Sequence, residues 1–365
     1  MILSRYYTYS TFEKALGQVL LDSPVQDISQ QQIGKSIKGR SIYGLKLGRG
    51  KTRVLIWSQM HGNESTTTRA LLQLLSDGLP PLLLNDLKLH IIPVLNPDGA
   101  ENWTRVNALG IDLNRDAVDL SQPESKVLRH AFDNFKPHYC LNLHGQRTIY
   151  GNLEGTLPAQ LSFLAPAGDT NKSITEARLK SMHLINTMVH HLNIENAVIG
   201  RYSDTFNRNC VGDFFTSQGV PTLLFEAGHA GQDYSRELIR YYIKDALQNC
   251  LLNIPRIEKI DLDPDKIIEE YESIPNIAQN YVDILIKNLP DESGARYDLS
   301  VLYIEEVHDE VLYFLPMVAG INDKSVLNAH RVIDARQFNA DLIDFKISEN
   351  GIFSSTTFEI DVFCE

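Results

Sequence analysis

The 365-residue sequence has no long hydrophobic run, no secretion-signal pattern and no cluster of basic residues. A membrane-spanning helix needs about 20 consecutive apolar residues, and because no run approaches that length we expect no membrane partner. The N-terminus lacks a basic start followed by an apolar block, so we expect no signal peptide. Since no basic patch is present, we also expect no nucleic-acid partner.

Closely spaced cysteines are also missing. The four cysteines are scattered along the chain, and no two of them form a CxxC pair. Cys140 falls in an apolar, strand-like stretch, where a reduced and buried thiol is the usual state. Reduced cysteines fit a reducing compartment. We therefore predict a cytoplasmic protein.

Basic residues become scarce towards the C-terminal end of the chain. Residues 1–255 carry 25 Lys and Arg against 23 Asp and Glu, whereas residues 256–365 carry 9 against 23. The whole chain has a formal net charge of -12. A charge step of this kind indicates a change of domain. We therefore predict one domain over residues 1–255 and an acidic accessory domain over residues 256–365.

The first domain contains four short, continuously apolar runs that predict buried strands. They cover residues 54–58, 89–95, 139–143 and 222–225. Continuous apolar runs are typical of strands covered on both faces, as in parallel sheets. Helical patterns lie around them, over residues 65–75, 124–135, 174–192 and 234–252. This alternation predicts an α/β fold with a mixed, mainly parallel sheet flanked by helices.

The pattern changes after residue 252. A connector that contains Pro and Asp covers residues 253–266, and a short helix is predicted over residues 267–273. Strand-like runs follow at residues 282–286, 300–305, 311–315, 342–347 and 356–363. These runs predict a small, β-rich C-terminal domain.

Polar motifs follow each of the four predicted strands of the first domain. His61 and Glu64 follow the first strand, Asn-Pro-Asp-Gly at residues 96–99 follows the second, His144 the third and Glu226 the fourth. Open α/β sheets bind ligands just outside the carboxyl ends of their strands. We therefore expect these four motifs to meet in one cleft.

Two histidines and one glutamate among these residues predict a zinc site. A catalytic zinc usually has three protein ligands and keeps a fourth position for water. Taken alone, His61-x-x-Glu64 is a weak signal, because a loop histidine before a glutamate at a helix N-terminus gives the same pattern. His144 at a second strand end strengthens it. The sequence has no HExxH, which excludes the arrangement with both histidines on one helix.

Five segments carry a more specific resemblance. They are MHGNEST at 60–66, NPDG at 96–99, TRVNALGIDLNRD at 104–116, LNLHG at 141–145 and FEAG at 225–228. In this order they resemble the zinc carboxypeptidases of the metallocarboxypeptidase (M14) family, of the bacterial type and with an extra C-terminal module. The resemblance covers residues 30–252 approximately and implies a zinc-carboxypeptidase-like fold for the first domain.

The resemblance implies one Zn²⁺ per chain, bound by His61, Glu64 and His144. It also implies that Glu226 is the general base, which takes a proton from the metal-activated water and delivers it to the leaving nitrogen. Arg105 matches the arginine that stabilises the oxyanion, because a fixed cation beside developing negative charge favours the transition state.

The resemblance further implies how a substrate is held. Asn114 and Arg115 match the pair that grips the terminal carboxylate of the substrate, a role for which the planar guanidinium of arginine is suited. Asp112 matches a carboxylate that orients a zinc-bound histidine. Tyr202 is the nearest candidate for the mobile tyrosine that covers the bound substrate.

The chain departs from the family in the residues around the substrate. Asn63 stands where many members have an arginine just before the ligand glutamate, so one substrate contact is expected to be missing. Val211 and Gly212 fall near the residue that sets the side-chain preference, and neither is charged. The neighbouring Arg201 and Arg208 either favour an acidic substrate or lie in a solvated loop.

The sequence thus predicts a zinc metallocarboxypeptidase, a hydrolase that removes the C-terminal residue from a peptide. An alternative is a related zinc amidohydrolase, either a deacylase of N-acyl amino acids or an amidase of cell-wall peptides. A binding protein with a relic catalytic domain is a third hypothesis, and the presence of all three ligands and of Glu226 argues against it. The expected partner is a peptide or N-acyl amino acid with a free carboxylate. The role of the C-terminal domain and the oligomeric state are left open.

Overall fold

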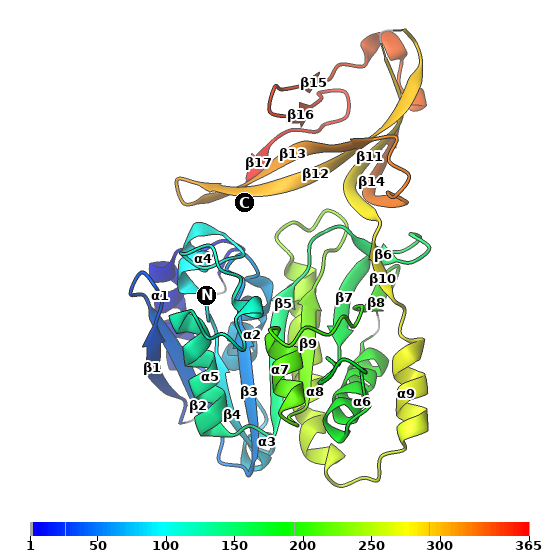
Figure 1. Ribbon diagram of the computed structural model, residues 1–365. Coiled ribbons are helices and arrows are strands. Elements are labelled where there is room, and N and C mark those ends of the chain that lie inside the picture. Colours follow the sequence, from blue (N-terminus) through cyan, green and yellow to red (C-terminus); the bar gives the residue numbers. More distant parts are fainter. Residues whose placement is uncertain (1–2, 26, 193, 292, 365) are drawn as a thin grey trace.

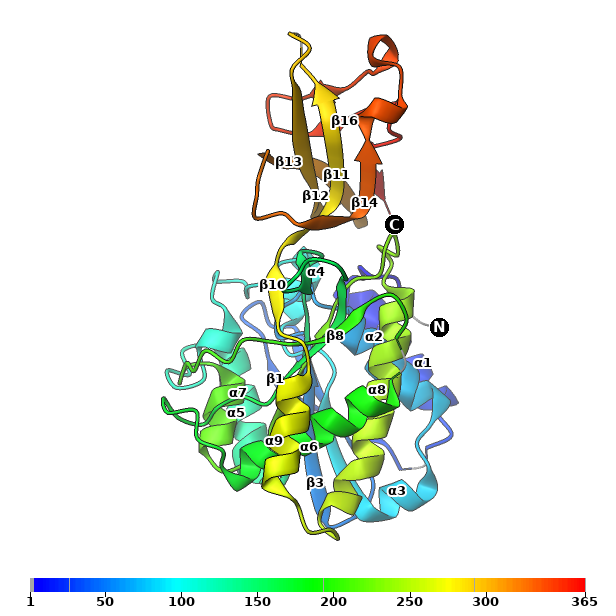
Figure 2. The same cartoon turned by 90° about the vertical axis from the view of Figure 1, so that its right-hand side faces the viewer.

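The computed structural model describes residues 3–25, 27–192, 194–291 and 293–364. It contains a larger unit, in which helices surround a sheet, and a smaller unit made mostly of strands (Figure 1). The smaller unit lies over one end of the larger unit, so residues far apart in the sequence meet there (Figures 1 and 2). No helix in the described ranges is long and apolar enough to cross a membrane.

An eight-stranded sheet forms the middle layer of the larger unit, with the strand order β1-β2-β4-β3-β5-β9-β7-β8. Its strands are β1 (Ser29–Lys35), β2 (Ser41–Leu47), β3 (Thr52–Ser58), β4 (Leu87–Ile92), β5 (Tyr139–Gly145), β7 (Ala159–Leu164), β8 (Val198–Arg201) and β9 (Thr222–Ala227). The pairs β4–β3, β3–β5, β5–β9 and β7–β8 are parallel, and the other three pairs are antiparallel. The predicted mixed, mainly parallel sheet is confirmed.

Helices cover both faces of this sheet (Figure 2). They are α1 (Tyr9–Asp22), α2 (Thr66–Asp77), α3 (Pro81–Asp86), α4 (Pro97–Asn102), α5 (Pro123–Phe135), α6 (Glu176–His191), α7 (Val211–Ser217), α8 (Glu237–Ile257) and α9 (Pro264–Ser273). Val54 and Ile56 of β3 pack in one core with residues of α1, α2, α6 and α8. Leu55 and Trp57 pack in the opposite core with residues of α5 and α7. Alternate side chains of a strand point to opposite faces, so an apolar run without alternation is what a sheet covered on both faces requires.

A second sheet of five strands forms the smaller unit, in the order β14-β11-β12-β13-β17. The strands of this region are β10 (Ile277–Gln279), β11 (Tyr281–Pro290), β12 (Arg296–His308), β13 (Val311–Ile321), β14 (Asn328–Asp334), β15 (Lys346–Ile347), β16 (Phe353–Ser354) and β17 (Phe363–Cys364). The β-rich C-terminal domain is confirmed, but a strand over residues 356–363 is wrong. Thr356 and Thr357 bond to the carboxylate of Asp344 there, and such local side-chain bonds compete with strand pairing.

The short helix α9 belongs by its contacts to the larger unit. Ile267, Tyr271 and Ile274 are buried in the same core as α6 and α8. The division of the chain at residues 255 and 256 stays a prediction, and α8 runs through that point to Ile257. We propose that the first unit extends through Ser273, and that the link to the second unit is β10, which pairs with β6 (Tyr150–Asn152) of the larger unit.

Polar and aromatic contacts join the two units. Glu305 of β12 accepts hydrogen bonds from the Arg5 guanidinium at 2.5 Å and from the Trp103 indole at 3.0 Å. Asp283 of β11 has no solvent exposure and accepts hydrogen bonds from the Tyr234 hydroxyl at 2.9 Å and the Thr148 hydroxyl at 3.2 Å. Carboxylates of the acidic second unit therefore attach it to the first unit, because they accept hydrogen bonds from side chains of that unit.

The buried carboxyl of Asp283 predicts a pH-dependent stability. Burial, with a smaller effect of Glu305, raises the pKa of Asp283 to about 6. Between about pH 4 and 6 the folded state therefore holds a proton that the unfolded state releases, so this residue makes the protein less stable as the pH rises through that window. Relative to Asp283→Asn, the zinc-free wild type should lose roughly 2 to 3 kcal/mol of unfolding free energy between pH 4 and 7 in urea titrations. A difference between the two proteins that does not change with pH would contradict this.

Candidate active site

One cleft of about 690 Å³ lies at the carboxyl ends of the central strands of the large sheet. It is lined by residues at the ends of β3, β5 and β9, by the segment after α4, by α7 and by β12 of the second unit. The sheet topology accounts for this, because β3, β5 and β9 are adjacent and parallel, and their carboxyl ends meet on one edge. Three of the four strand-end motifs of the sequence therefore meet in the cleft. The fourth, NPDG at 96–99, does not line it, and its backbone lies against Gly62 of the loop between His61 and Glu64.

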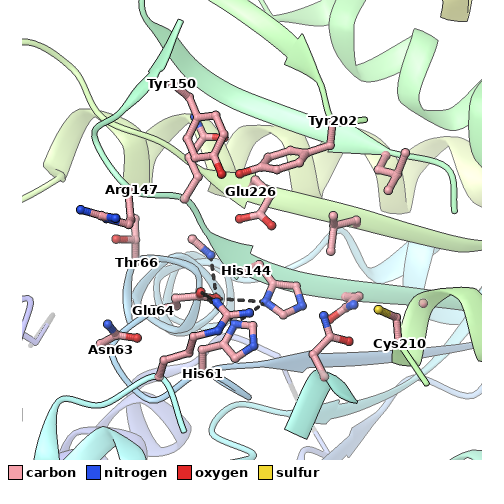
Figure 3. A pocket seen from close by; sticks show the side chains of 18 of the residues that line it. His61, Asn63, Glu64, Thr66, His144, Arg147, Tyr150, Tyr202, Cys210 and Glu226 are labelled. Carbon is pink, nitrogen blue, oxygen red and sulfur yellow. Dashed lines mark hydrogen bonds and ion pairs between the residues drawn. The ribbon is translucent and has the colours of Figure 1, made fainter. Parts of the chain in front are cut away.

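Three side chains of this cleft form a compact group of metal-ligand type. The Nδ1 atom of His61 lies 2.8 Å from Oε1 of Glu64, and the Nδ1 atom of His144 lies 2.9 Å from Oε2 of Glu64. The two Nδ1 atoms are 3.1 Å apart. Figure 3 shows the three side chains pointing towards one another. In the part of the chain that is described, this is the one group of three or more such residues close enough to hold an ion.

The loop from His61 to Glu64 can be this tight because of Gly62. A Cβ atom at residue 62 would lie 1.9 Å from the backbone of Gly99 and cannot be accommodated. The amide of Glu64 donates to the carbonyl of His61 at 3.1 Å, which closes the turn. Glycine therefore lets the NPDG segment approach, and the turn brings the histidine and the glutamate to the same side.

These donor atoms fit a zinc ion. Zinc bound by nitrogen at about 2.1 Å in a tetrahedron separates its ligand atoms by about 3.4 Å, and the distances found here are only a few tenths of an ångström shorter. The Nε2 atom of His61 is hydrogen-bonded to Asp112 at 3.0 Å, which leaves Nδ1 as the free donor towards the ion. Burial would raise the pKa of Glu64, but the His61 and His144 imidazoles lower it below its usual range, so this carboxyl is an anion. Two imidazoles and one carboxylate are a common ligand set of catalytic zinc.

Glu226 lies beside this group because β9 pairs with β5. In the parallel register, Glu226 is directly opposite His144. Burial raises the pKa of the Glu226 carboxyl well above its usual value, and the nearby Glu64 carboxylate adds to this, while Arg105 and Arg236 oppose it. A bound dication would be the largest charge nearby and would also favour the ionised form. The position and the environment are those of a group that exchanges a proton.

Arg105 and Asp112 form a charged bridge next to the metal group. The Arg105 guanidinium is about half exposed and lies 3.1 Å from Oδ2 of Asp112 and 3.4 Å from Oε1 of Glu64. Asp112 also contacts His61, so one carboxylate orients both a ligand imidazole and a cation. The guanidinium is thereby held at the mouth of the cleft, beside the three ligands.

Asn114 and Arg115 lie on a short 3₁₀ turn that follows Asp112. The Asn114 side-chain oxygen accepts a hydrogen bond from the amide of Val211 at 3.0 Å. The Arg115 guanidinium donates to the carbonyl of Asn114 at 2.8 Å and to the Cys210 sulfur at 3.1 Å. Both side chains line the cleft, and no carboxylate of the described chain pairs with Arg115. An anionic group can therefore be received at this end of the cleft.

Tyr202 lies across the cleft from the metal group, next to Tyr150. The two rings are 5.3 Å apart, and Figure 3 shows them above Glu226. Burial, followed by the charge of Glu226, raises the pKa of the Tyr202 hydroxyl, which therefore stays neutral and can donate a hydrogen bond. Tyr202, which was only the nearest candidate in the sequence, therefore lies within the cleft.

The pocket around α7 differs from what the sequence indicated. Gly212 lines the cleft, where a Cβ atom would lie 3.1 Å from Pro166, whereas Val211 is buried outside it. The next residue, Asp213, also lines the cleft, and burial raises its pKa to about 6. Neither Arg201 nor Arg208 lines the cleft. The proposed effect of these two arginines on an acidic substrate therefore has no contact to act through.

Several cleft residues were not identified from the sequence. Arg147 and Gln146 follow His144 directly, so their closeness along the chain was the available signal. Arg236 is the N-cap residue of α8, and Tyr303 and Glu305 belong to β12 of the second unit. No sequence pattern connects these three to the metal group. Arg236 is held at the cleft within the first unit, by hydrogen bonds to the carbonyls of Gln146 and Ala227. Tyr303 and Glu305 reach it through the packing of the two units.

A model of the family described as zinc carboxypeptidase matches residues 21–149 of this chain. The protein named carboxypeptidase 2 of Trichophyton tonsurans is 30% identical over 99 residues, which make up 26% of this chain and 18% of that protein. This chain therefore covers less than a fifth of that relative's length. The range matched by the family model contains His61, Glu64 and His144.

Solved structures show the same architecture. A metallo-carboxypeptidase from Burkholderia cenocepacia superposes with a TM-score of 0.55 at 20% identity, over 69% of this chain and 70% of that chain. A metallo-carboxypeptidase from Pseudomonas aeruginosa, in complex with (2-guanidinoethylmercapto)succinic acid, superposes with a TM-score of 0.52 at 18% identity, over 68% of this chain and 69% of that chain. At these identities the likeness establishes the fold.

Proposed function

Since the chain belongs to the zinc carboxypeptidase (M14) family, we propose that it is a zinc-dependent carboxypeptidase that hydrolyses the C-terminal peptide bond of peptides. One observation carries this proposal. A single cleft contains a three-ligand metal group, a buried carboxyl and an arginine without a carboxylate partner in the described chain. These are the parts that hydrolysis of a bond next to a free carboxylate requires.

The three ligands His61, Glu64 and His144 would hold one zinc ion. When bound, zinc lowers the pKa of water and polarises a carbonyl oxygen. Glu226 lies beside the ligands and would accept a proton from the attacking water and pass it to the leaving nitrogen. Burial raises the pKa of Glu226 above the usual value of a glutamate, which favours the uptake of a proton from water.

Arg105 would stabilise the negative charge that develops on the scissile carbonyl oxygen. Its guanidinium is already fixed by Asp112, so little reorganisation is needed when charge appears. Asn114 and Arg115 would bind the terminal carboxylate of the substrate, and Tyr202 would donate a hydrogen bond from the opposite wall. Asp112 would act on the metal group indirectly, by orienting His61.

The carboxylate requirement is the sharpest test of this proposal. Charge-assisted hydrogen bonds contribute about 1.5 to 3 kcal/mol, so converting the terminal carboxylate to an amide should lower kcat/KM by roughly 10- to 150-fold in the wild type. The Arg115→Gln variant should lose a similar factor in kcat/KM with the free acid, and its kcat/KM values for the acid and the amide should differ little. Both numbers come from initial rates with a matched pair of peptides. Arg208→Gln is the matched control, because Arg208 is exposed and lies outside the cleft. Equal rates for acid and amide in the wild type would refute a carboxypeptidase.

A related zinc amidohydrolase is the second candidate. It is favoured by Tyr303 and Ile304 of the second unit, which line the cleft, because side chains there leave less room for a long peptide than for a small acyl group. A peptide library digested by the enzyme and read by mass spectrometry separates the two, since it reports which bonds are cut. Hydrolysis of N-acyl amino acids without hydrolysis of peptides would decide for the amidohydrolase.

We also propose a cytoplasmic location. The four cysteines are unpaired in the structure, and Cys140 and Cys250 are buried, which supports a reducing compartment. Fractionation of source cells with an antibody against the protein tests this, and recovery outside the cytoplasm would contradict it.

A further inference from the structure

The cleft has two ends, on opposite sides of the metal group. Figure 3 shows Cys210 on one side of the three ligands, and Arg147 and Asn63 on the other side. The Cys210 sulfur accepts a hydrogen bond from Arg115, which marks that end as the place of the substrate's terminal carboxylate. The opposite end, at Arg147, therefore faces the acyl side of the scissile bond, an assignment that rests on the proposed function.

Polar atoms at the Arg147 end have no partners within the described chain. Arg147 is exposed to the cleft, and its guanidinium makes no hydrogen bond or ion pair there. Asn63 Oδ1, Gln146 Oε1 and Arg236 Nε are buried and also have none. The Gln146 and Arg236 side chains are only 4% and 5% exposed. Because buried polar groups are normally hydrogen-bonded, these atoms indicate a polar ligand.

The charges at this end favour an anion. The cations Arg5 and Arg105 are paired with Glu305 and Asp112 respectively. Arg236 instead donates to two backbone carbonyls, those of Gln146 at 2.8 Å and Ala227 at 3.1 Å. Arg147 and Arg236 thus lack a carboxylate at bonding distance in the ranges described. Two guanidinium groups next to a zinc site make a cation-rich surface, which attracts a negatively charged group.

The second unit limits the size of what can lie here. Tyr303, Ile304 and Glu305 of β12 line the cleft, and Glu305 is held in place by Arg5 and Trp103. The carbonyl of Arg5 in turn accepts a hydrogen bond from the Ser65 hydroxyl, next to the ligand Glu64. The wall formed by β12 is therefore tied to the metal loop, and a long acyl chain would meet it.

We propose that Arg147 is a specificity-determining residue that binds a carboxylate on the acyl side of the substrate. The ligand class is a short peptide with Glu or Asp before the released residue, or an amino acid acylated by a dicarboxylic acid. Arg147 supplies the accessible guanidinium, because a planar fork can hold a carboxylate in two hydrogen bonds. Arg236, which donates to the carbonyl of Gln146 just before Arg147, adds a second positive charge. Arg147, in the loop after β5, thus supplies a cation on the side of the cleft where Asn63 carries no charge.

The test compares substrates that differ only in this charge. Let X be the residue that the wild type releases fastest from a peptide library, or alanine if it releases none. Acetyl-Glu-X should be hydrolysed at least about tenfold better in kcat/KM than acetyl-Gln-X. The same comparison of kcat/KM between succinyl-X and butyryl-X tests the other source of the carboxylate, a dicarboxylic acyl group. Arg147→Gln should reduce both preferences to about one, whereas Arg208→Gln, at an exposed arginine outside the cleft, should leave them unchanged.

A binding measurement separates this inference from the proposed function. Zinc-loaded Glu226→Gln, with and without Arg147→Gln, is titrated with acetyl-Glu-X and acetyl-Gln-X in a calorimeter. If the wild type cuts peptides but its charge preference survives Arg147→Gln, the inference is overturned and the carboxypeptidase stands. If no peptide is cut but Arg147→Gln abolishes tighter binding of the Glu peptide, the inference stands and the proposed function is overturned. Equal binding of both peptides by both proteins overturns the inference.

Discussion

Glu226→Gln should lower kcat by roughly 10²- to 10⁴-fold while one zinc ion per chain remains bound. The amide of glutamine has nearly the shape of the carboxyl group, but it neither accepts the proton of the attacking water nor passes it to the leaving nitrogen. Glu226 is not one of the three ligands, which already form a complete set around the ion site. The rate comes from steady-state kinetics with a saturating peptide, and the zinc content comes from elemental analysis of the same sample.

The matched control is Glu349→Gln, which makes the same chemical change at an exposed residue of the second unit. It should keep both the rate and the zinc of the wild type. A rate for Glu226→Gln close to that of the wild type would show that another group acts as the base. Loss of zinc together with loss of rate would place Glu226 in the ligand set instead of beside it.

The central strands and the zinc group could be predicted from the sequence because local pattern and sheet topology agree there. The runs Val54–Ser58 and Tyr139–Leu143 are apolar without alternation, and they became adjacent parallel strands with helices on both faces. Their following residues, His61 and His144, then had to meet, because parallel neighbours end on one edge. The zinc group was predictable for this reason, and the family segments extended the prediction to Arg105, Asn114 and Arg115.

The remaining parts of the cleft depend on contacts that no local pattern encodes. Glu305 lies 241 positions after Glu64 in the chain and reaches the cleft only because Arg5 and Trp103 hold it there. Exposed and buried residues alternate only in part along β12. Such a pattern predicts a strand, but it does not predict which other part of the chain the strand packs against. The charge step near residue 255 reflects surface composition, whereas the apolar face of α9 decides which core that helix joins.

His144→Ala should abolish both zinc binding and hydrolysis. Changing even an outer partner of a metal ligand costs about 10- to 100-fold in affinity, so removing a ligand itself should weaken zinc binding by more than that. The wild type should unfold at a higher temperature when zinc is added, because a ligand at 100 times its Kd stabilises the folded state by about 2.7 kcal/mol. The variant should show no such shift. Zinc affinity is measured by competition with a chelating indicator, and the thermal shift by calorimetry.

His90→Ala is the matched control for the loss of a buried imidazole. His90 of β4 is 4% exposed, lies outside the cleft and leaves a hole of the same size when truncated. Both variants should therefore lose stability without zinc, through the cavity each leaves, but only His144→Ala should lose the zinc-dependent shift. If His144→Ala still bound zinc with the affinity of the wild type, the ligand set would be wrong, and the assignment of Glu226 beside it would lose its basis.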